Sequence, residues 1–510
     1  MNFPWYTRAL LAAASGVTLA LSFPNYNLAF LAWISIGLLI LASAGASGRQ
    51  SPLYGFIHGL AFYPVGLPWI DTVMHQYGNV DPLSSAGLLL LLAATFGLLL
   101  TIFSWGVARA SRKSVELASV LAPFLWVALE LVRTRLPILG FPWCLAGYAA
   151  TGSLGLLQIV SVTGIYGLSF LIAAYGSLFA YAILTGRQRV WKILLVATAL
   201  LIFVGVSGKY LVPRAEAHHI AHLVQTDFPQ SEEYPSNWMQ VHAQDMKELE
   251  EMSVDAARGE PGIIIWPEVP APFSLQDLAF QRLAARIAQE SGQDFLVGIV
   301  DWKRNESGKW IATNSAVLLD PSGHRVFTYD KIHLVPFGEY VPLRKYLTFA
   351  KRLTADISDF TPGTLYRVGV IPGGRFGVFI CYESIFPDEI RQFSLGGANL
   401  LINISNDGWF GRSSAPAQHL MMARVRAVEA RRWLLRGTNN GYTVSIDPYG
   451  RTVASLAPDM RGQLDAPYDF RTDTSLYVRF GDWLAWVCVA VSLILLAFSF
   501  FKRPLASHRG

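Results

Sequence analysis

The chain has 510 residues and a net charge of +5, with 52% hydrophobic and only 15% charged residues. This balance is too apolar for an ordinary soluble enzyme and is typical of a membrane protein that carries a soluble part. The net charge is too small to indicate a nucleic-acid partner. The three cysteines, Cys144, Cys381 and Cys488, show neither metal-ligand spacing nor a disulfide pattern, so we expect no metal and no cofactor.

Seven apolar segments precede the more polar part of the chain and one follows it. Most approach the roughly 20 residues that cross a hydrocarbon core about 30 Å thick, although the first and third are short. We expect eight transmembrane helices, at roughly 9–23, 27–45, 54–70, 84–107, 117–132, 158–184, 191–208 and 483–501. The predicted domains are a seven-helix membrane domain (1–212), a globular domain (213–478), and a last transmembrane helix with a cytoplasmic tail (479–510).

The basic residues of the short loops predict the orientation in the membrane. On one side of the membrane, the short loops carry only two basic residues, Arg133 and Arg135. The other side carries Arg8, Arg49, Arg109, Arg112, Lys113, Arg187, Arg189, Lys192, Lys502, Arg503 and Arg509. By the positive-inside rule both termini are cytoplasmic, and an odd number of spans then puts 209–480 on the far side. In a bacterium that side is the periplasm or the outer surface.

Strands and helices alternate through the globular part, which spans about 260 residues. Strands are expected at 219–228, 261–268 and 294–302, hairpins at 315–335 and 442–456, and helices at 238–257, 275–291 and 416–435. RFGVFICYE and ANLLINISNDGWFG are two further strands that end in polar residues. Because these strands are almost continuously apolar, we expect an α/β domain whose sheets are covered on both faces.

Three motifs at strand ends carry groups that fit one chemistry. WPE supplies Glu268, YDKIHLVPFGE supplies Lys331 and Glu339, and CYE supplies Cys381. A thiol attacks as its thiolate, a carboxylate can take and return the proton, and a lysine can stabilise an oxyanion. Taken alone, such a cysteine is usually a core residue, and such an acid or lysine is usually solvated. Their joint occurrence in one domain favours an active site.

The Glu–Lys–Cys set resembles the nitrilase superfamily, which implies an αββα sandwich with Glu268, Lys331 and Cys381 as its catalytic triad. The whole chain resembles the bacterial apolipoprotein N-acyltransferases in its spans and in the blocks WPE, DKIHLVPFGEYVP, CYE and NDGWFG. The stretch VQTDFPQ departs from that family, where Gly-Asn would be expected in place of Thr226-Asp227.

This resemblance implies a multi-pass protein of the bacterial inner membrane with a periplasmic catalytic domain. Its acyl donor would be a glycerophospholipid of the lipid bilayer. Its acceptor would be the α-amino group of the N-terminal diacylglyceryl-cysteine of a lipoprotein, reached through a thioester on the catalytic cysteine. No cofactor is implied.

The resemblance also implies a role for each motif residue. Cys381 attacks the ester, Glu268 is general base and then general acid, and Lys331 stabilises the oxyanion with the backbone N–H of Tyr382. Glu339 orients Lys331 or the acceptor amine. Tyr382 and Glu383 shape the pocket.

Four further residues are singled out, and the two tryptophans among them have two interpretations each. Trp238 is either a lipid contact or a core aromatic at a helix start. Trp143 either lines the acyl entrance or belongs to an interfacial aromatic belt, the interpretation that we favour. Asn406 of NDGWFG lies in a tight turn and is a candidate for the pocket floor. Cys144 is expected to be a packing residue.

The stretch 341–356 has the pattern of an interfacial helix, although a plain surface helix would show it too. Its apolar residues fall on one helical face and its basic residues on another. The two sets are Leu343, Tyr346, Leu347, Ala350 and Leu353, and Arg344, Lys345, Lys351 and Arg352.

Two other functions fit parts of this pattern. A membrane-tethered nitrilase-like amidohydrolase has the same triad, but its eight spans would serve only as a tether. A transporter with an accessory domain needs ionisable residues within the spans, and Glu130 is almost the only one.

Overall fold

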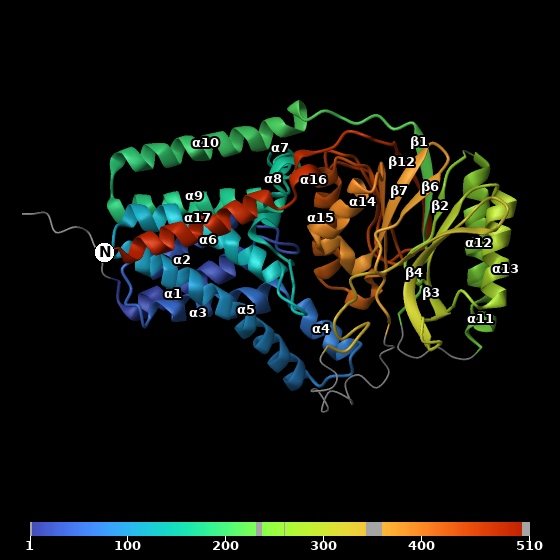
Figure 1. The fold of residues 1–510 in the computed structure, drawn as a ribbon, viewed down its shortest axis with the longest axis horizontal. Coiled ribbons are helices and arrows are strands. Elements are labelled where there is room, and N and C mark those ends of the chain that lie inside the picture. Colours follow the sequence, from blue (N-terminus) through green and yellow to red (C-terminus); the bar gives the residue numbers. More distant parts are fainter. Residues whose placement is uncertain (1–2, 231–236, 260, 343–359, 502–510) are drawn as a thin grey trace, which may run out of the picture.

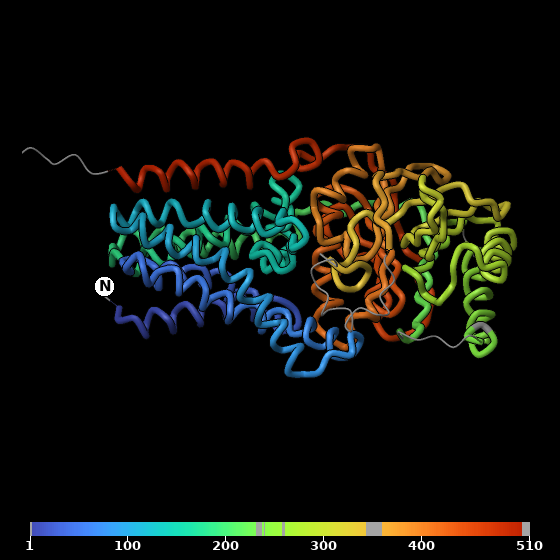
Figure 2. The backbone as a smooth tube through the Cα atoms, turned by 60° about the horizontal axis from the view of Figure 1, so that its bottom comes forward, coloured from blue at the N-terminus to red at the C-terminus, as the bar shows by residue number. Residues whose placement is uncertain are grey.

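Two parts of the chain lie end to end, a helical bundle and a β-sandwich (Figure 1). The computed structural model describes residues 3–230, 237–259, 261–342 and 360–501. The bundle contains the N-terminal helices and the last helix, which returns to it from the sandwich. Both ends of the described chain lie at the end of the bundle farthest from the sandwich, as a second view also shows (Figure 2).

Helices occur at all eight positions where the sequence predicts spans. They are α1 (Trp5–Ala20), α2 (Ala32–Ser43), α3 (Ser51–Gly66), α5 (Pro82–Ser111), α6 (Val115–Thr134), α9 (Ile165–Thr185), α10 (Gln188–Leu211) and α17 (Trp483–Phe500). Within the described residues, five of them are long and apolar enough to cross a membrane, namely α5, α6, α9, α10 and α17. The membrane character is therefore supported, and the count of eight spans stays a prediction.

Glycines let the bundle helices approach closely, as small residues do in membrane proteins. A Cβ atom at Gly55 of α3 would come within 1.9 Å of the Leu100 carbonyl oxygen of α5. A Cβ atom at Gly208 of α10 would come within 2.3 Å of the Gly155 backbone nitrogen. These contacts leave no room for a side chain.

The predicted span 158–184 is interrupted near its start. Gly164 has φ +65°, which ends the short helix α8 (Val160–Thr163), and α9 begins at Ile165. The Ile165 N–H donates to the Glu429 carboxylate at 2.9 Å. A carboxylate at a helix N-terminus is favourable. Because Glu429 belongs to the sandwich and Ile165 to the bundle, this contact also joins the two parts.

The sandwich has two six-stranded sheets, in the orders β12-β1-β2-β3-β4-β5 and β11-β10-β9-β8-β7-β6. The first contains β1 (His219–Gln225), β2 (Ile264–Ile265), β3 (Phe295–Arg304), β4 (Trp310–Leu319), β5 (Arg325–Asp330) and β12 (Gly462–Tyr468). The second contains β6 (Val368–Ile371), β7 (Gly374–Ile380), β8 (Leu400–Ser405), β9 (Leu434–Thr438), β10 (Thr443–Ile446) and β11 (Thr452–Leu456).

Helices cover the outer faces of both sheets, which gives the layers of an αββα sandwich (Figure 1). The helices α12 (Ala243–Gly259) and α13 (Leu278–Ser291) cover the first sheet. The helices α14 (Pro387–Leu395) and α15 (Ala415–Ala430) lie between the second sheet and the bundle. One apolar core runs from the bundle through α15 to both sheets, so the two parts are packed together rather than tethered.

Three details differ from the sequence-based expectations. The predicted helix 416–435 ends at Ala430, because Arg431 adopts a left-handed conformation (φ +55°) and β9 begins at Leu434. The strand expected at 261–268 contains only Ile264 and Ile265. The edge strands β6 and β12 were not predicted. Of the expected interfacial stretch 341–356, only Val341 and Pro342 lie within the described residues.

Candidate active site

The strand ends that carry the motifs meet at one edge of the sandwich. Glu268 follows β2 and Lys331 follows β5 in the first sheet, while Cys381 follows β7 and Asn406 follows β8 in the second. Within each sheet the strands concerned run in the same direction. Their carboxyl ends therefore lie at one edge, where loops from both sheets face each other.

Lys331 is held between two carboxylates. Its Nζ lies 3.2 Å from Glu268 Oε1 and 2.9 Å from Glu339 Oε1. Burial alone would lower the pKa of Lys331, but the charges of Glu268 and Glu339 raise that pKa well above its ordinary value. The lysine is only 1% exposed, so the site holds a permanent buried cation.

Asn314 joins the two carboxylates and was missed by the sequence analysis. Its side-chain amide donates to Glu268 Oε1 at 2.7 Å and to Glu339 Oε1 at 2.8 Å. Its backbone carbonyl accepts from the Lys331 N–H at 2.8 Å. The available signal was a polar Thr-Asn-Ser step inside the apolar strand β4.

Cys381 opens a short 3₁₀ turn, Cys381–Ile385, which we call the nucleophile turn. Its φ of +48° is costly for a residue with a side chain, by about 1–2 kcal/mol. Burial, together with the Glu268 and Asp407 carboxylates, raises the pKa of the Cys381 thiol, and Lys331 and a hydrogen bond with Ser405 only partly offset that rise. The resting group is therefore a thiol that needs a base.

Glu383 braces the nucleophile turn from one side. Its Oε2 accepts from the Ile380 N–H at 2.7 Å, and its Oε1 accepts from the Tyr329 hydroxyl and the Ile332 N–H, each at 2.7 Å. Burial and the neighbouring Glu389 raise the pKa of Glu383 to about 7. The carboxyl thus ties the turn to the loop that follows Lys331.

Tyr382 and Asn406 lie beside these groups. The Tyr382 ring is buried and packs edge-on against Phe386. The Asn406 backbone N–H donates to Glu268 Oε2 at 2.9 Å, so this residue fixes the second oxygen of that carboxylate.

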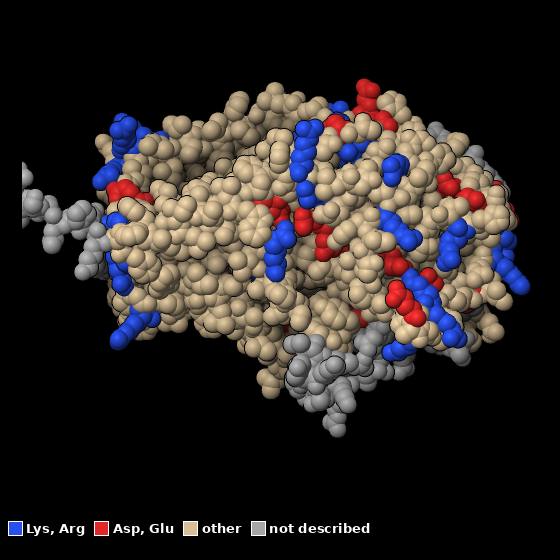
Figure 3. All heavy atoms as spheres, viewed as in Figure 1, with Lys and Arg blue, Asp and Glu red and all other residues tan. Residues whose placement is uncertain are grey.

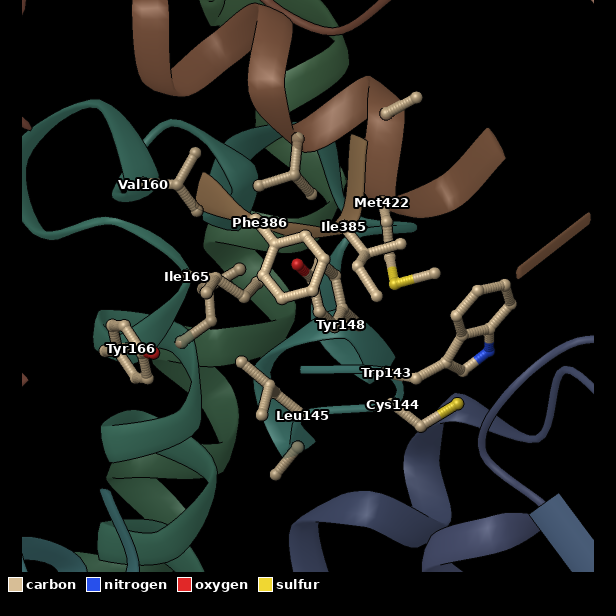
Figure 4. Close-up of a cluster of buried hydrophobic side chains, with 14 of the residues drawn as sticks. Trp143, Cys144, Leu145, Tyr148, Val160, Ile165, Tyr166, Ile385, Phe386 and Met422 are labelled. Carbon is tan, nitrogen blue, oxygen red and sulfur yellow. The ribbon is translucent and has the colours of Figure 1, made fainter. Parts of the chain in front are cut away.

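The two tryptophans lie in apolar cores. Trp238 is buried at the start of the short helix α11 (Trp238–Val241) and packs against Phe228 and Phe273, which matches the core interpretation. Trp143 is fully buried, so the interpretation as an interfacial belt residue is wrong. The loop that carries it folds under α15, where Trp143 stacks on His419, and Figure 4 shows Trp143 and Cys144 in the same buried cluster as Met422 of that helix. Cys144 is a buried free cysteine, as expected of a packing residue.

A cluster of charged residues lies behind the nucleophile turn and was also missed. Arg436 of β9 donates to both Asp407 oxygens, at 2.9 and 2.8 Å, and to the Asn403 side chain. His419 of α15 lies 3.0 Å from the Cys381 carbonyl oxygen. Burial and Arg436 lower the pKa of His419, so its ring is neutral. Two features of the sequence could have indicated this cluster, namely Arg436 inside an apolar strand and Asp407 in the NDGWFG block.

A cavity of about 540 Å³ lies where the bundle meets the sandwich. It is lined by the end of α6 and the loop after it, by the residues after Lys331 and by the start of α14. Its polar side chains include Arg135, which is 2.7 Å from Asp482, and His333, which is 2.7 Å from Glu389. Acidic and basic side chains are visible together at this junction (Figure 3).

Known proteins match the chain over both of its parts. The family model of the apolipoprotein N-acyltransferase N-terminal domain matches residues 15–178, and that of carbon-nitrogen hydrolase matches residues 233–472. An apolipoprotein N-acyltransferase of Geobacter metallireducens is 36% identical, with 97% of this chain and 96% of that protein covered. One of Methylococcus capsulatus is 33% identical, with 98% of each covered. An amidase from Nesterenkonia sp. of known structure is 20% identical and covers 53% of this chain and 95% of its own, with a TM-score of 0.37.

Proposed function

The chain belongs to the apolipoprotein N-acyltransferase family, and from that premise we propose the reaction and the residues that perform it. The enzyme is an acyltransferase that N-acylates bacterial lipoproteins. Its donor is a glycerophospholipid, and its acceptor is the α-amino group of an N-terminal diacylglyceryl-cysteine. The observation that carries the assignment of residues is the buried Glu268–Lys331–Glu339 cluster, which comes from the same edge of the sandwich as Cys381.

In the first half-reaction, Glu268 takes the proton of the Cys381 thiol, and the sulfur attacks the ester carbonyl carbon. Negative charge develops on the carbonyl oxygen, where the Lys331 ammonium stabilises it. The ester C–O bond then breaks, and Glu268 returns the proton to the leaving oxygen. The products are a lysophospholipid and an acyl thioester on Cys381.

In the second half-reaction, the acceptor amine attacks the thioester carbonyl. Glu268 takes a proton from the amine, the C–S bond breaks, and the proton passes to the sulfur. Glu339 shares the Lys331 ammonium with Glu268 and so keeps it in place for both steps. The products are an amide on the lipoprotein and the free thiol.

The contact with the membrane bundle favours acyl transfer between lipids over hydrolysis of a small amide. Extraction of an acyl chain from the bilayer costs about 0.8 kcal/mol per CH₂ group, and a site at the bilayer surface avoids that cost. Transport has little support, because the carboxylate of Glu130 accepts hydrogen bonds from Trp126 and from the Ala146 N–H within the folded bundle.

The first half-reaction can be tested without lipoprotein. Wild-type protein incubated with phospholipid alone should gain one hydroxylamine-labile acyl group and release one lysophospholipid per enzyme. Cys381→Ala should gain none, and Cys381→Ser should gain almost none, because a hydroxyl is a much weaker acid than a thiol. Wild-type release of lysophospholipid without a bound acyl group would indicate simple hydrolysis and contradict the proposal.

We also propose that residues 1–212 and 479–510 belong to the membrane part, with both termini cytoplasmic and the catalytic domain (213–478) periplasmic. The support is the row of Lys and Arg at the end of the bundle far from the sandwich (Figure 3). In a Cys381→Ser background, Lys309→Cys should react with an impermeant thiol reagent added outside the inner membrane, whereas Arg189→Cys should not. The reverse pattern would overturn this orientation.

A further inference from the structure

His419 lies directly behind the nucleophile turn and is fully buried. Its Nε2 is 3.0 Å from the Cys381 carbonyl oxygen and 2.7 Å from Ser384 Oγ. Its Nδ1 is 3.1 Å from Arg436 Nη2, which can only donate, and 3.1 Å from Asp407 Oδ1, which takes its own hydrogen bonds from Arg436 and Ser405. The neutral ring has a single N–H, and the Cys381 carbonyl oxygen can only accept, so the contact at Nε2 is a hydrogen bond when the ring proton lies on Nε2.

The nucleophile turn needs such a contact. A residue with a side chain persists at positive φ only where its surroundings over-determine the conformation, and Cys381 is such a residue. Glu383 holds the N–H of Ile380 on one side of Cys381, and His419 holds the carbonyl of Cys381 on the other. These two contacts hold the backbone on both sides of the Cα atom that carries the thiol.

The membrane bundle holds α15 next to His419. The neighbouring residue, Gln418, is fully buried, and the hydrogen bonds of its side chain all go to residues of the bundle. It accepts from the indole N–H groups of Trp143 and Trp69 and donates to the carbonyls of Pro24 and Gly66. The Trp143 ring also stacks on the His419 ring, with centroids 5.7 Å apart and planes at 22°.

We propose that His419 is a positioning residue for the nucleophile, and that Gln418 and Trp143 transmit the position of the membrane bundle to it. The bundle then sets the geometry of Cys381 in addition to anchoring the enzyme. This inference rests on the proposed function only in taking Cys381 as the nucleophile.

The first test compares three histidine variants. His419→Leu should slow the first formation of the thioester by about 10²-fold, as expected for a misplaced nucleophile, with an almost unchanged KM for phospholipid. His419→Gln should stay within about tenfold of the wild-type rate, because its amide can still donate to the Cys381 carbonyl.

The matched control is His222→Leu, which removes a buried histidine of β1 that bonds Asp465. Folded His222→Leu should react at the wild-type rate. A wild-type rate for His419→Leu, or equal losses in His419→Leu and His419→Gln, would overturn the proposal.

The second test isolates the link to the bundle and does not require a variant of His419. Gln158 also joins the two parts, through the Tyr449 carbonyl and Arg431, but it does not touch His419. Gln418→Leu should slow thioester formation about tenfold, whereas Gln158→Leu should leave the rate per folded molecule unchanged. Equal rates in the two variants would contradict the transmission through Gln418.

Alkylation of Cys381 by iodoacetamide separates this inference from the proposed function. If wild-type protein formed no thioester with phospholipid, the proposed function would fail. The alkylation rates of the same variants would still rank wild type above His419→Gln and His419→Gln above His419→Leu if His419 positions the thiol. Identical alkylation rates in the three proteins would overturn the positioning role on their own.

Discussion

In the membrane bundle the helices approach until backbone touches backbone, whereas at the edge of the sandwich that carries the motifs the buried contacts join charged side chains. Gly55 of α3 leaves no space for a Cβ atom beside α5. Lys331 fills the space between Glu268 and Glu339, with almost no exposure to solvent. A substitution in the bundle should therefore change stability, and one in the buried charge cluster should change chemistry. Substitutions at Lys331, Glu383 and Gly55 should separate these two kinds of effect.

Lys331→Met tests the chemical side of the contrast. It removes the cation that two carboxylates share and leaves the developing oxyanion without its donor. We expect the rate of thioester formation to fall by about 10³-fold, at the upper end for loss of one oxyanion donor. Single-turnover assays with a labelled acyl chain would measure it. Lys247→Met, which breaks an exposed pair with Glu251 on α12, is the control and should keep the wild-type rate. A fall of less than tenfold in the rate of thioester formation by Lys331→Met would contradict the role of Lys331 in stabilising the oxyanion.

Glu383→Gln should affect both stability and chemistry, because the Glu383 carboxyl supports the nucleophile turn but takes no part in the proposed reaction. The new amide would point an N–H group at the Ile380 N–H, so we expect the transfer rate to fall by about 10–10²-fold. The pH dependence of stability should change as well. The folded-state pKa of Glu383 is raised to about 7, so the folded protein binds more protons than the unfolded chain between about pH 4.5 and 7.

Wild-type stability should therefore fall as pH rises through that window, by roughly 3 kcal/mol from this group. Glu383→Gln should show a flatter profile in thermal unfolding measured from pH 4.5 to 8. Burial also raises the pKa of Glu429 to about 7, but this group contributes equally to both proteins and cancels in the comparison. Parallel profiles for the two proteins would contradict a titration of Glu383 in this range.

Gly55→Ala tests the structural side of the contrast. The added methyl group would meet the Leu100 carbonyl of α5, so we expect a loss of about 1–3 kcal/mol in stability. The rate of acyl transfer per folded molecule should not change. Gly87→Ala is the matched control in α5, because nothing beyond the adjacent backbone of its own helix lies within 4 Å of the added Cβ, and it should not destabilise the protein. Thermal unfolding in detergent and transfer assays on the folded fraction would measure both quantities. A lower transfer rate at full stability would place Gly55 in the chemistry instead.

The sequence predicted the parts of the site that end strands, and it missed the parts that lie inside elements. Glu268, Lys331 and Cys381 each follow a stretch with the pattern of a strand, and that position is visible without a structure. Asn314 and Arg436 lie within strands, and their partners come from distant segments, so local patterns could not identify them.

Segments whose partners are remote caused the other errors. Trp143 looked like an interfacial residue because nothing in its own loop indicates that the loop folds under α15. The helix expected at 416–435 ran too far, because apolar residues continue past Arg431 and only the pairing of β9 with β8 and β10 makes them a strand. The helix positions in the bundle were predictable from apolar length. Their close packing at glycines was not.

Discharge of a preformed thioester would show whether the acyl group passes from Cys381 to the acceptor amine. The enzyme would first be acylated with a labelled phospholipid, freed of excess lipid, and then mixed with a diacylglyceryl-cysteine peptide that has a free N-terminus. We expect the label to leave Cys381 and to appear in an amide on the peptide, with one acyl group transferred per acylated enzyme. The same peptide with an acetylated N-terminus should leave the label on Cys381. Equal loss of label with both peptides, or labelled fatty acid in place of the amide, would contradict transfer from Cys381 to the amine.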